Sequence, residues 1–324
     1  MENPHLQGVF GIVPTPFTKD GDLDEKGLGH LVNHCEKSGL HAAVVMGSNG
    51  EFPYLTSEEK ARVMKIASEA AGGRIPVVAG VSAFGTREAV EQARKAREAG
   101  CQAVMATLPL YFELDFEAVK EHFRILAGEG GLPVIFYYFP EVTGLVLGPD
   151  QMEELAAIDG IHGAKITVFN RSFLKRVIRL TRTHLWAVFA GTAFMLQDAV
   201  KQGGAGVICP LPLIAPKDCL DLYNAMQKDK TDDAQEIQDK ILGAASLFMD
   251  MEISHSMSVA YIKAMIRKPY SGTSERPESG VALIKEALRQ QGHPVTAVVR
   301  RPCQPLSPEQ KEKVKDVLES QGWL

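Results

Sequence analysis

Lys165 is the residue whose type and position most directly indicate covalent chemistry. It lies near the end of an apolar run, Ile161–Ile166, that has the character of a buried strand. Loss of water favours the uncharged form of an amine, and an uncharged amine can attack a ketone to form a Schiff base. The alternative is a lysine that merely extends its charged end into solvent at the rim of the fold. Position alone leaves both interpretations open.

Tyr137 is a second candidate, because it lies at the end of the apolar run that precedes the run of Lys165. Side chains alternate along a strand, so only one of Tyr137 and Tyr138 can face the interior. A phenol beside the amine would move protons to and from a substrate oxygen. Packing in an aromatic core is the competing interpretation, and for a tyrosine considered alone it is the better one.

The segment Gly47–Glu51 has the composition of an anion-binding turn. Ser48 and Asn49 stand between two glycines, directly after an apolar run that predicts a strand. Such a turn lets backbone N–H groups converge on an anion, and the carboxylate of a substrate would suit it. A glycine turn after a strand is common, so the pattern carries little weight by itself.

Short apolar runs alternate with charged stretches of helical period along the first two thirds of the chain. Strands that are apolar on both faces and joined by helices predict a parallel sheet with right-handed crossovers. Eight strand–helix cycles favour an α/β fold of the (βα)8 (TIM) barrel type over a doubly wound open sheet. The predicted strands cover residues 8–14, 42–46, 76–81, 103–108, 133–138, 161–166, 185–190 and 206–209. Active sites of such barrels lie at the carboxyl ends of the strands, where Lys165, Tyr137 and Gly47–Glu51 fall.

The strand pattern stops near Asp218, and the rest of the chain predicts helices. We expect residues 1–217 to form the barrel core and residues 218–324 to supply the last barrel helix and a C-terminal helical extension. The predicted helices cover residues 220–226, 233–249, 257–266, 280–289 and 308–320. Lys268–Glu278 is rich in Pro, Ser, Gly and charge, and it predicts a surface loop.

Composition argues against several other classes of protein. The chain has 324 residues, and 35 Lys+Arg against 40 Asp+Glu give a net charge of −5. Nucleic-acid binding favours a basic surface, so we expect no nucleic-acid partner. No apolar run approaches the roughly 20 residues of a membrane span. We therefore expect no membrane association and a cytoplasmic protein, or a mitochondrial one if a targeting segment has been removed. The five cysteines lack a C-x-x-C pair and are expected to be buried free thiols.

Several short motifs, taken together, resemble the dihydrodipicolinate synthase/N-acetylneuraminate lyase family of class I aldolases. The resemblance covers nearly the whole chain. It rests on Thr15-Pro16-Phe17, Gly47–Glu51, Tyr137 three residues before Pro140, Gly163-Ala164-Lys165, Gly206–Ile208, and Arg301-Pro302 followed by Pro305–Ser307. It implies a Schiff-base mechanism on a small-molecule 2-oxo acid, without a metal or a cofactor.

The resemblance also implies roles for individual residues. Lys165 would form the Schiff base with the ketone of a pyruvate-like substrate, and Tyr137 would be the acid and base of the reaction. Ser48 and Tyr111 would complete the catalytic group as a proton relay. The implied substrate-binding residues are Ser48, Asn49, Thr167, Ile208 and Gly191. In the family, the residue matching Tyr111 usually comes from a neighbouring subunit, so we expect a homotetramer built as a dimer of dimers.

Departures from the family pattern bear on the substrate. Val142 stands where dihydrodipicolinate synthases carry an arginine, and Ala193 and Phe194 stand where sialic acid lyases carry acidic residues. The Gly47–Pro53 string and the ending Leu306–Leu324 are similar to the 4-hydroxy-2-oxoglutarate aldolases of this family. We therefore expect conversion of 4-hydroxy-2-oxoglutarate to pyruvate and glyoxylate. Dihydrodipicolinate synthase-like activity, and aldolase or dehydratase activity on 2-keto-3-deoxy sugar acids, are the alternatives.

Three other functions compete with this interpretation. A metal-dependent aldolase would need converging ligands, and the i,i+4 pair His30 and His34 lacks the glutamate of an H-E-x-x-H motif. A phosphate-sugar barrel enzyme would use glycines after the last strands, such as Gly191 and Gly203–Gly206. A non-catalytic sensor of 2-oxo acids needs no proton relay, so the presence of the relay residues argues against it.

Overall fold

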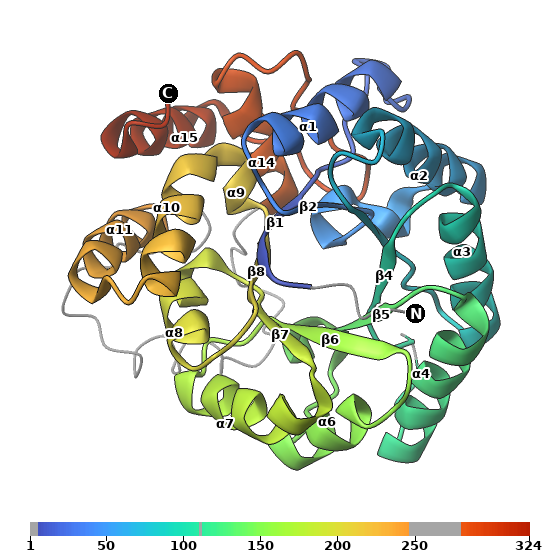
Figure 1. Ribbon diagram of the computed structural model, residues 1–324. Helices are drawn as coiled ribbons and strands as arrows, with labels where there is room; N and C mark the ends of the chain where they lie inside the picture. The colour runs from blue at the N-terminus through green and yellow to red at the C-terminus, as the bar shows by residue number, and fades with distance from the viewer. Residues whose placement is uncertain (1–5, 110–111, 246–279) are drawn as a thin grey trace.

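Eight parallel strands close into a barrel in their order along the chain, from β1 to β8. The structure is a computed structural model that describes residues 6–109, 112–245 and 280–324. The strands are β1 Gly8–Ile12, β2 Ala42–Val45, β3 Val77–Gly80, β4 Ala103–Ala106, β5 Val134–Tyr138, β6 Ile161–Ile166, β7 Ala187–Ala190 and β8 Gly206–Cys209. The barrel closes where β1 pairs with β8, with Gly8 opposite Gly206. The expected (βα)8 barrel is therefore confirmed (Figure 1).

The interior of the barrel is filled by alternate side chains of the strands. These side chains form one buried apolar cluster of Phe10, Ile12, Ala42, Val44, Val78, Ala103, Met105, Ile135, Tyr137, Phe189 and Ile208. Tyr137 thus faces the interior, and Tyr138 faces the helices. The Tyr138 hydroxyl donates to the carbonyl of Leu147 at 3.2 Å and accepts the N–H of Leu147 at 3.0 Å. The alternation rule leaves open which tyrosine points inward, and the barrel register decides it.

Helices surround the strands as an outer ring (Figure 1). Those of the barrel region are α1 Glu25–Lys37, α2 Ser57–Ala71, α3 Thr86–Glu98, α4 Phe116–Gly130, α5 Pro140–Thr143, α6 Pro149–Ala156, α7 Arg171–Thr181, α8 Leu196–Lys201, α9 Leu211–Ile214 and α10 Pro216–Gln227. Local sequence explains their ends. Thr56 and Glu59 form the reciprocal capping box at the start of α2, and Gly72 ends α2 in the left-handed conformation.

Several predicted boundaries differ from the structure by a few residues, and two of the differences have a clear local cause. The strand expected from residue 185 begins at Ala187, because Leu185 has a φ of 53° and ends a short 3-10 turn. The helix expected from residue 220 begins at Pro216, since proline fits the first position of a helix, where no N–H is needed. Both differences arise at ends of elements, where one backbone angle decides the boundary.

The C-terminal helices pack on the outside of the barrel. They are α11 Thr231–Gly243, α14 Gly280–Gln290 and α15 Pro308–Gln321. Helix α14 contacts α9 and the short turn η1, Ser48–Gly50, and α15 contacts α14 and α11 (Figure 1). The helix predicted over 257–266 and the loop predicted over Lys268–Glu278 lie outside the described residues. The extension therefore reaches a turn that the sequence marks as chemically interesting.

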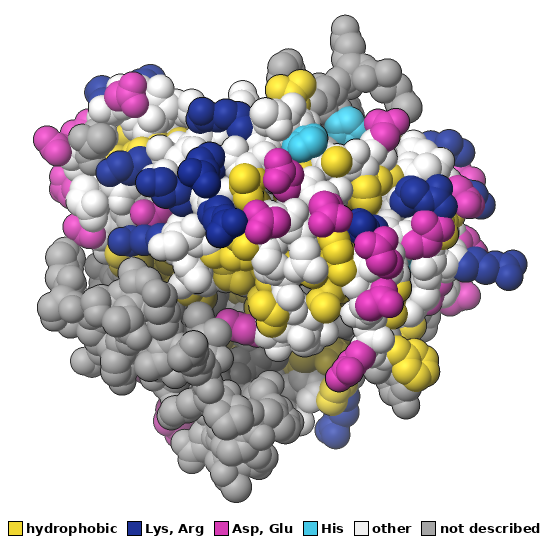
Figure 2. Space-filling view, turned by 90° about the horizontal axis from the view of Figure 1, so that it is seen from below, with side chains coloured by type: hydrophobic (Ala, Val, Ile, Leu, Met, Phe, Trp, Pro, Cys, Tyr) yellow, Lys and Arg dark blue, Asp and Glu magenta, His cyan; other side chains and the backbone are white. Residues whose placement is uncertain are grey.

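The described surface carries both signs of charge. Figure 2 shows lysine and arginine side chains together with aspartate and glutamate on one face, with apolar side chains between them. None of the helices in the described ranges is both long and apolar enough to cross a membrane. Four of the five cysteines are buried free thiols as predicted, whereas Cys303 is only half-buried, because it lies in the surface segment between α14 and α15.

Candidate active site

Lys165 lies inside the carboxyl end of the barrel. It is 3% exposed, and its neighbours in the ladder are Tyr137 on β5 and Phe189 on β7. Its Nζ lies 3.9 Å from the centroid of the Tyr137 ring. The parallel register of β5 with β6 thus places the two residues that the sequence predicts for amine and proton chemistry in direct contact.

The surroundings of Lys165 differ from those of Lys285, which is also buried. Lys285 is 1% exposed and forms an ion pair with Glu51. Lys165 has no such carboxylate among the described residues, and its amine instead rests on the face of an aromatic ring. The two buried lysines therefore differ in their partners, which are a carboxylate for Lys285 and the face of an aromatic ring for Lys165. An amine that is not engaged by a carboxylate is accessible to a substrate carbonyl.

Cys209 is a neighbour of Lys165 that sequence reasoning did not associate with the site. It ends β8, and burial raises the pKa of its thiol to about 11, against the opposing effect of the nearby Lys165. At neutral pH the thiol is therefore protonated. Because the thiolate is the nucleophilic form of cysteine, Cys209 does not compete with the amine.

The turn after β2 owes its shape to a left-handed residue. Met46 has a φ of 55°, and the chain then passes through Gly47 into the 3-10 turn η1. The Met46 carbonyl approaches β3 so closely that a Cβ on Gly80 would lie 2.0 Å from its oxygen. A left-handed residue other than glycine costs roughly 1–2 kcal/mol, so surrounding contacts must hold this turn.

Ser48 and Asn49 stand at the start of η1. The hydrogen bonds of the turn begin with Gly50 N–H to the Gly47 carbonyl at 2.9 Å, so the Ser48 and Asn49 amides are not used within it. The turn lies over the barrel interior, because a Cβ on Gly47 would touch side chains of the interior cluster. Thr15 donates its hydroxyl to the Gly50 carbonyl at 2.6 Å and ties the turn to the segment after β1.

Thr167 and Gly191 meet at the carboxyl ends of β6 and β7. A Cβ on Gly191 would lie 2.0 Å from the Thr167 Oγ1, so only glycine leaves room for this hydroxyl. The Thr167 Oγ1 is buried and has no hydrogen-bond partner among the described residues. A buried hydroxyl without a partner is costly, and it is therefore available to a ligand. Ile208 on β8 belongs to the same interior cluster as Tyr137.

The structure thus brings the predicted residues to one end of the barrel. Lys165 and Tyr137 are in direct contact, and Ser48, Asn49 and Thr167 follow the carboxyl ends of their strands. Tyr111 lies outside the described residues, so its part in the proton relay stays a prediction.

Glu51 and Lys285 form a contact at the site that the sequence analysis missed. The Glu51 carboxylate is 1% exposed; it pairs with Lys285 and accepts the Arg300 N–H at 2.8 Å. Lys285 also donates to the Val298 carbonyl at 2.8 Å, and burial lowers the pKa of Lys285 to about 8, against the opposing effect of Glu51. The sequence signal was a lysine inside the apolar run of α14, which has no surface to reach.

The two histidines weighed as metal ligands, His30 and His34, have other partners in the structure. His30 lies 3.0 Å from His293, and the ring nitrogens of His34 contact the Leu213 carbonyl and Ser38. Within the described ranges, no cluster of three or more histidine, cysteine, aspartate or glutamate side chains is arranged to hold a metal ion.

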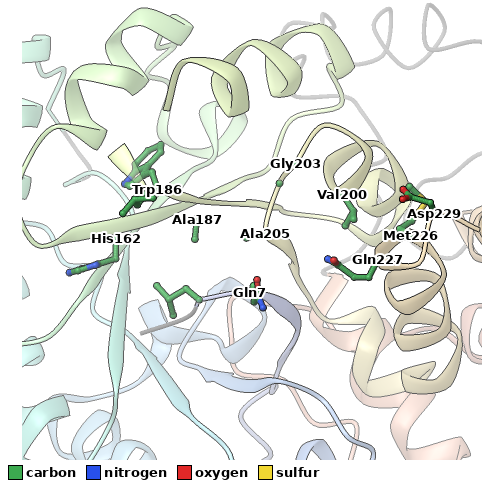
Figure 3. A pocket seen from close by; sticks show the side chains of 13 residues that line it. Gln7, His162, Trp186, Ala187, Val200, Gly203, Ala205, Met226, Gln227 and Asp229 are labelled. Atoms are coloured by element: carbon green, nitrogen blue, oxygen red, sulfur yellow. The ribbon is translucent and has the colours of Figure 1, made fainter. Parts of the chain in front are cut away.

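A cavity of about 660 Å3 lies at the opposite end of the barrel from Lys165. Figure 3 shows His162 and Trp186 on one side of this cavity, Gln227 and Asp229 on the other, and Gln7 between them. Gln7, His162 and Trp186 lie at the amino ends of strands or just before them, and Gln227 and Asp229 lie at the end of α10 or just after it. Because chemistry in this fold takes place at the carboxyl ends, we do not assign the reaction to this cavity.

The sequence was also compared with models of known protein families. A family model described as the dihydrodipicolinate synthetase family matches residues 5–269. The chain belongs to this family. The resemblance inferred from the motifs is thereby confirmed, and the chain is a lyase of the aldolase type.

Individual proteins match this chain over almost its full length. A 4-hydroxy-tetrahydrodipicolinate synthase from Methanothrix thermoacetophila is 29% identical over 314 residues, 97% of this chain and 96% of the relative. YagE, a prophage protein of the family from E. coli K12 in complex with pyruvate, matches with a TM-score of 0.85 at 26% identity, covering 98% of this chain and 99% of YagE. A monomeric dihydrodipicolinate synthase variant shares the fold, with a TM-score of 0.85 at 22% identity, covering 99% of this chain and 98% of the variant.

Gly80→Ala is expected to disturb the turn after β2, because the added methyl group would collide with the Met46 carbonyl. Overpacking of this kind costs about 1–3 kcal/mol. We expect a lower free energy of unfolding in urea and faster amide hydrogen exchange in Met46–Glu51. Gly128→Ala is the matched control, since a Cβ there meets nothing within 4 Å. Equal behaviour of the two variants would show that the close approach does not hold the turn.

Proposed function

We propose that this protein is a Schiff-base lyase that acts on a pyruvate-derived 4-hydroxy-2-oxo acid. The observation that carries the proposal is Lys165, a buried amine 3.9 Å from the Tyr137 ring at the carboxyl end of the barrel. Pyruvate bound to YagE, a relative that covers 98% of this chain, supports the substrate class. A sensor of 2-oxo acids is disfavoured, because binding alone needs no buried amine beside a phenol.

The reaction begins with attack of the Lys165 Nζ on the C2 carbonyl of the substrate. The carbonyl oxygen leaves as water, and a protonated imine remains. When the C3–C4 bond breaks, its electrons move into this imine and form an enamine. Tyr137 takes the proton of the C4 hydroxyl, which becomes the aldehyde, with Ser48 and Tyr111 as the relay. The enamine then gains a proton at C3, and water hydrolyses the imine to free pyruvate and Lys165.

The substrate carboxylate is held by the turn after β2. The Ser48 and Asn49 amides lie outside the hydrogen bonds of η1, and amides in such turns bind anions. Thr167 offers its unpaired hydroxyl to the variable half of the substrate, with Gly191 leaving the space and Ile208 lining the floor. None of these steps requires a metal or a cofactor.

Lys165→Ala should abolish both turnover and covalent trapping, because the variant lacks the amine that forms the imine. We expect intact-mass spectrometry after pyruvate and borohydride to show one adduct on the native protein and none on the variant. Lys120→Ala is the control, since Lys120 pairs with Glu117 and Glu154 on the helical surface. A Lys165→Ala protein that is still trapped or active would overturn the mechanism.

We propose 4-hydroxy-2-oxoglutarate as the substrate, which is split into pyruvate and glyoxylate. Val142 occupies the position where the family resemblance places an arginine in dihydrodipicolinate synthases, and Val142 is 59% exposed. Ala193 and Phe194, which replace the acidic pair of sialic acid lyases, are buried. The second candidate is 4-hydroxy-tetrahydrodipicolinate synthase activity, favoured by the name of the Methanothrix relative.

A substrate panel separates these candidates. Pyruvate release should be fastest from 4-hydroxy-2-oxoglutarate, because its second carboxylate is attached directly to C4. The carboxylate of aspartate semialdehyde lies two carbons farther from the reacting carbon and would need the cation that position 142 lacks. Condensation of pyruvate with aspartate semialdehyde should be slower by at least about 100-fold, the cost of roughly 2.7 kcal/mol for an unpaired carboxylate. Faster condensation than cleavage would assign the chain to the synthase activity, and preference for a sugar acid would assign it to that aldolase class.

We propose a homotetramer, built as a dimer of dimers, in which Tyr111 crosses an interface. The support is a set of exposed apolar side chains on the loops after β3, β4 and β5: Phe84, Phe112, Val142 and Val146, each at least 59% exposed. Such side chains on adjacent loops are typical of a covered surface. We expect a tetramer in sedimentation velocity, whereas a monomer at every concentration, as in the monomeric relative, would contradict this assembly.

A further inference from the structure

The C-terminal extension holds the turn that carries Ser48 and Asn49 through a buried carboxylate. Glu51 directly follows η1, and its side chain reaches two partners from the extension. One partner is the Lys285 ammonium on α14, and the other is the Arg300 N–H at 2.8 Å. Helix α14 also packs directly against η1. More than 230 residues of chain separate Glu51 from Lys285, so this contact exists only in the folded barrel.

The backbone of the turn after β2 is strained, so contacts from outside the turn must stabilise it. Met46 and Glu51, at its two ends, both have left-handed φ angles, 55° and 53°, without being glycine. Strained conformations persist only where surrounding contacts determine them. Gly80 and the Met46 carbonyl form the contact at one end, and the Lys285–Glu51 pair forms the contact at the other.

The aromatic ring of Phe17 completes the support. The Lys285 Nζ lies 4.2 Å from the ring centroid, and the Arg300 guanidinium lies 4.4 Å from it. Arg300 in turn pairs with Glu59 and donates to the Tyr54 carbonyl at 3.1 Å. The contacts therefore join the segment after β1, the turn after β2 and the extension into one network.

We infer that Lys285 and Glu51 are positioning residues for the carboxylate of the substrate: their ion pair holds the Ser48 and Asn49 amides in the geometry that binds it. The inference rests on the proposed function, because it assigns the turn to a 2-oxo carboxylate. Neither side chain touches the substrate. Loss of the pair lets the turn relax toward unstrained φ angles, and the two amides then no longer converge.

Lys285→Met tests the inference, with borohydride trapping of pyruvate as the measurement. The pyruvate concentration for half-maximal trapping should rise about tenfold, the order of one lost charge-assisted hydrogen bond. The trapping rate at saturation should stay near that of the native protein, since Lys165 is unchanged. Amide hydrogen exchange in Met46–Glu51 should become faster without any ligand present.

Two further variants make the test decisive. Arg289→Met is the matched control, because Arg289 on the same helix pairs with the buried Glu286 and is not in contact with the turn. Its pyruvate affinity should equal that of the native protein. Glu51→Gln combined with Lys285→Met leaves no unpaired buried charge, so it guards against simple unfolding of the single variant. We expect the double variant to fold and to show the same weakened trapping.

Each outcome has a distinct meaning. Native affinity and native hydrogen exchange in both Lys285 variants would overturn the positioning role and leave the lyase mechanism intact. An equal loss of affinity in Arg289→Met would also overturn it, since the effect would then follow general destabilisation. Absence of any pyruvate adduct on the native protein would instead overturn the proposed function, and this inference would fall with it.

Discussion

The parallel pairing of β5 with β6 places Tyr137 opposite Lys165, and the chemistry of the site depends on this register. Side chains alternate along a strand, so a shift of one residue would turn both groups toward the helices and bring Tyr138 and Ile166 inside. Closure of the barrel fixes the register, because each strand is paired on both sides. The amine is thereby buried against the face of the Tyr137 ring.

The two buried lysines, Lys285 and Lys165, have different partners. Lys285 has a carboxylate and a backbone carbonyl as partners, and it stabilises a contact between distant segments. Lys165 lacks a carboxylate among the described residues, and its Nζ lies against the Tyr137 ring. A buried charge needs partners, so a buried lysine without a carboxylate among the described residues is a candidate functional group.

The C-terminal extension and the barrel are joined at the turn after β2. Helix α14 packs against α9 and η1, and its Lys285 reaches Glu51, the residue that ends η1. The loops that follow the strands of this fold carry binding groups, and a loop needs support from outside to keep strained backbone angles. Here that support comes from Gly80, Lys285 and the Arg300 N–H, and the Lys285 and Arg300 side chains in turn rest on the Phe17 ring.

The sequence by itself determined the strand–helix alternation, the position of Lys165 near the end of an apolar strand and the composition of the turn after β2, because periodicity and residue type are local properties. It also carried the family, through short motifs such as Gly163-Ala164-Lys165. Only the tertiary structure decided that Tyr137, and not Tyr138, faces the Lys165 amine. It also decided that Met46 has a left-handed backbone conformation with its carbonyl against Gly80, and that Lys285 pairs with Glu51. These features depend on barrel register and on contacts between segments far apart in the chain, which no local pattern specifies.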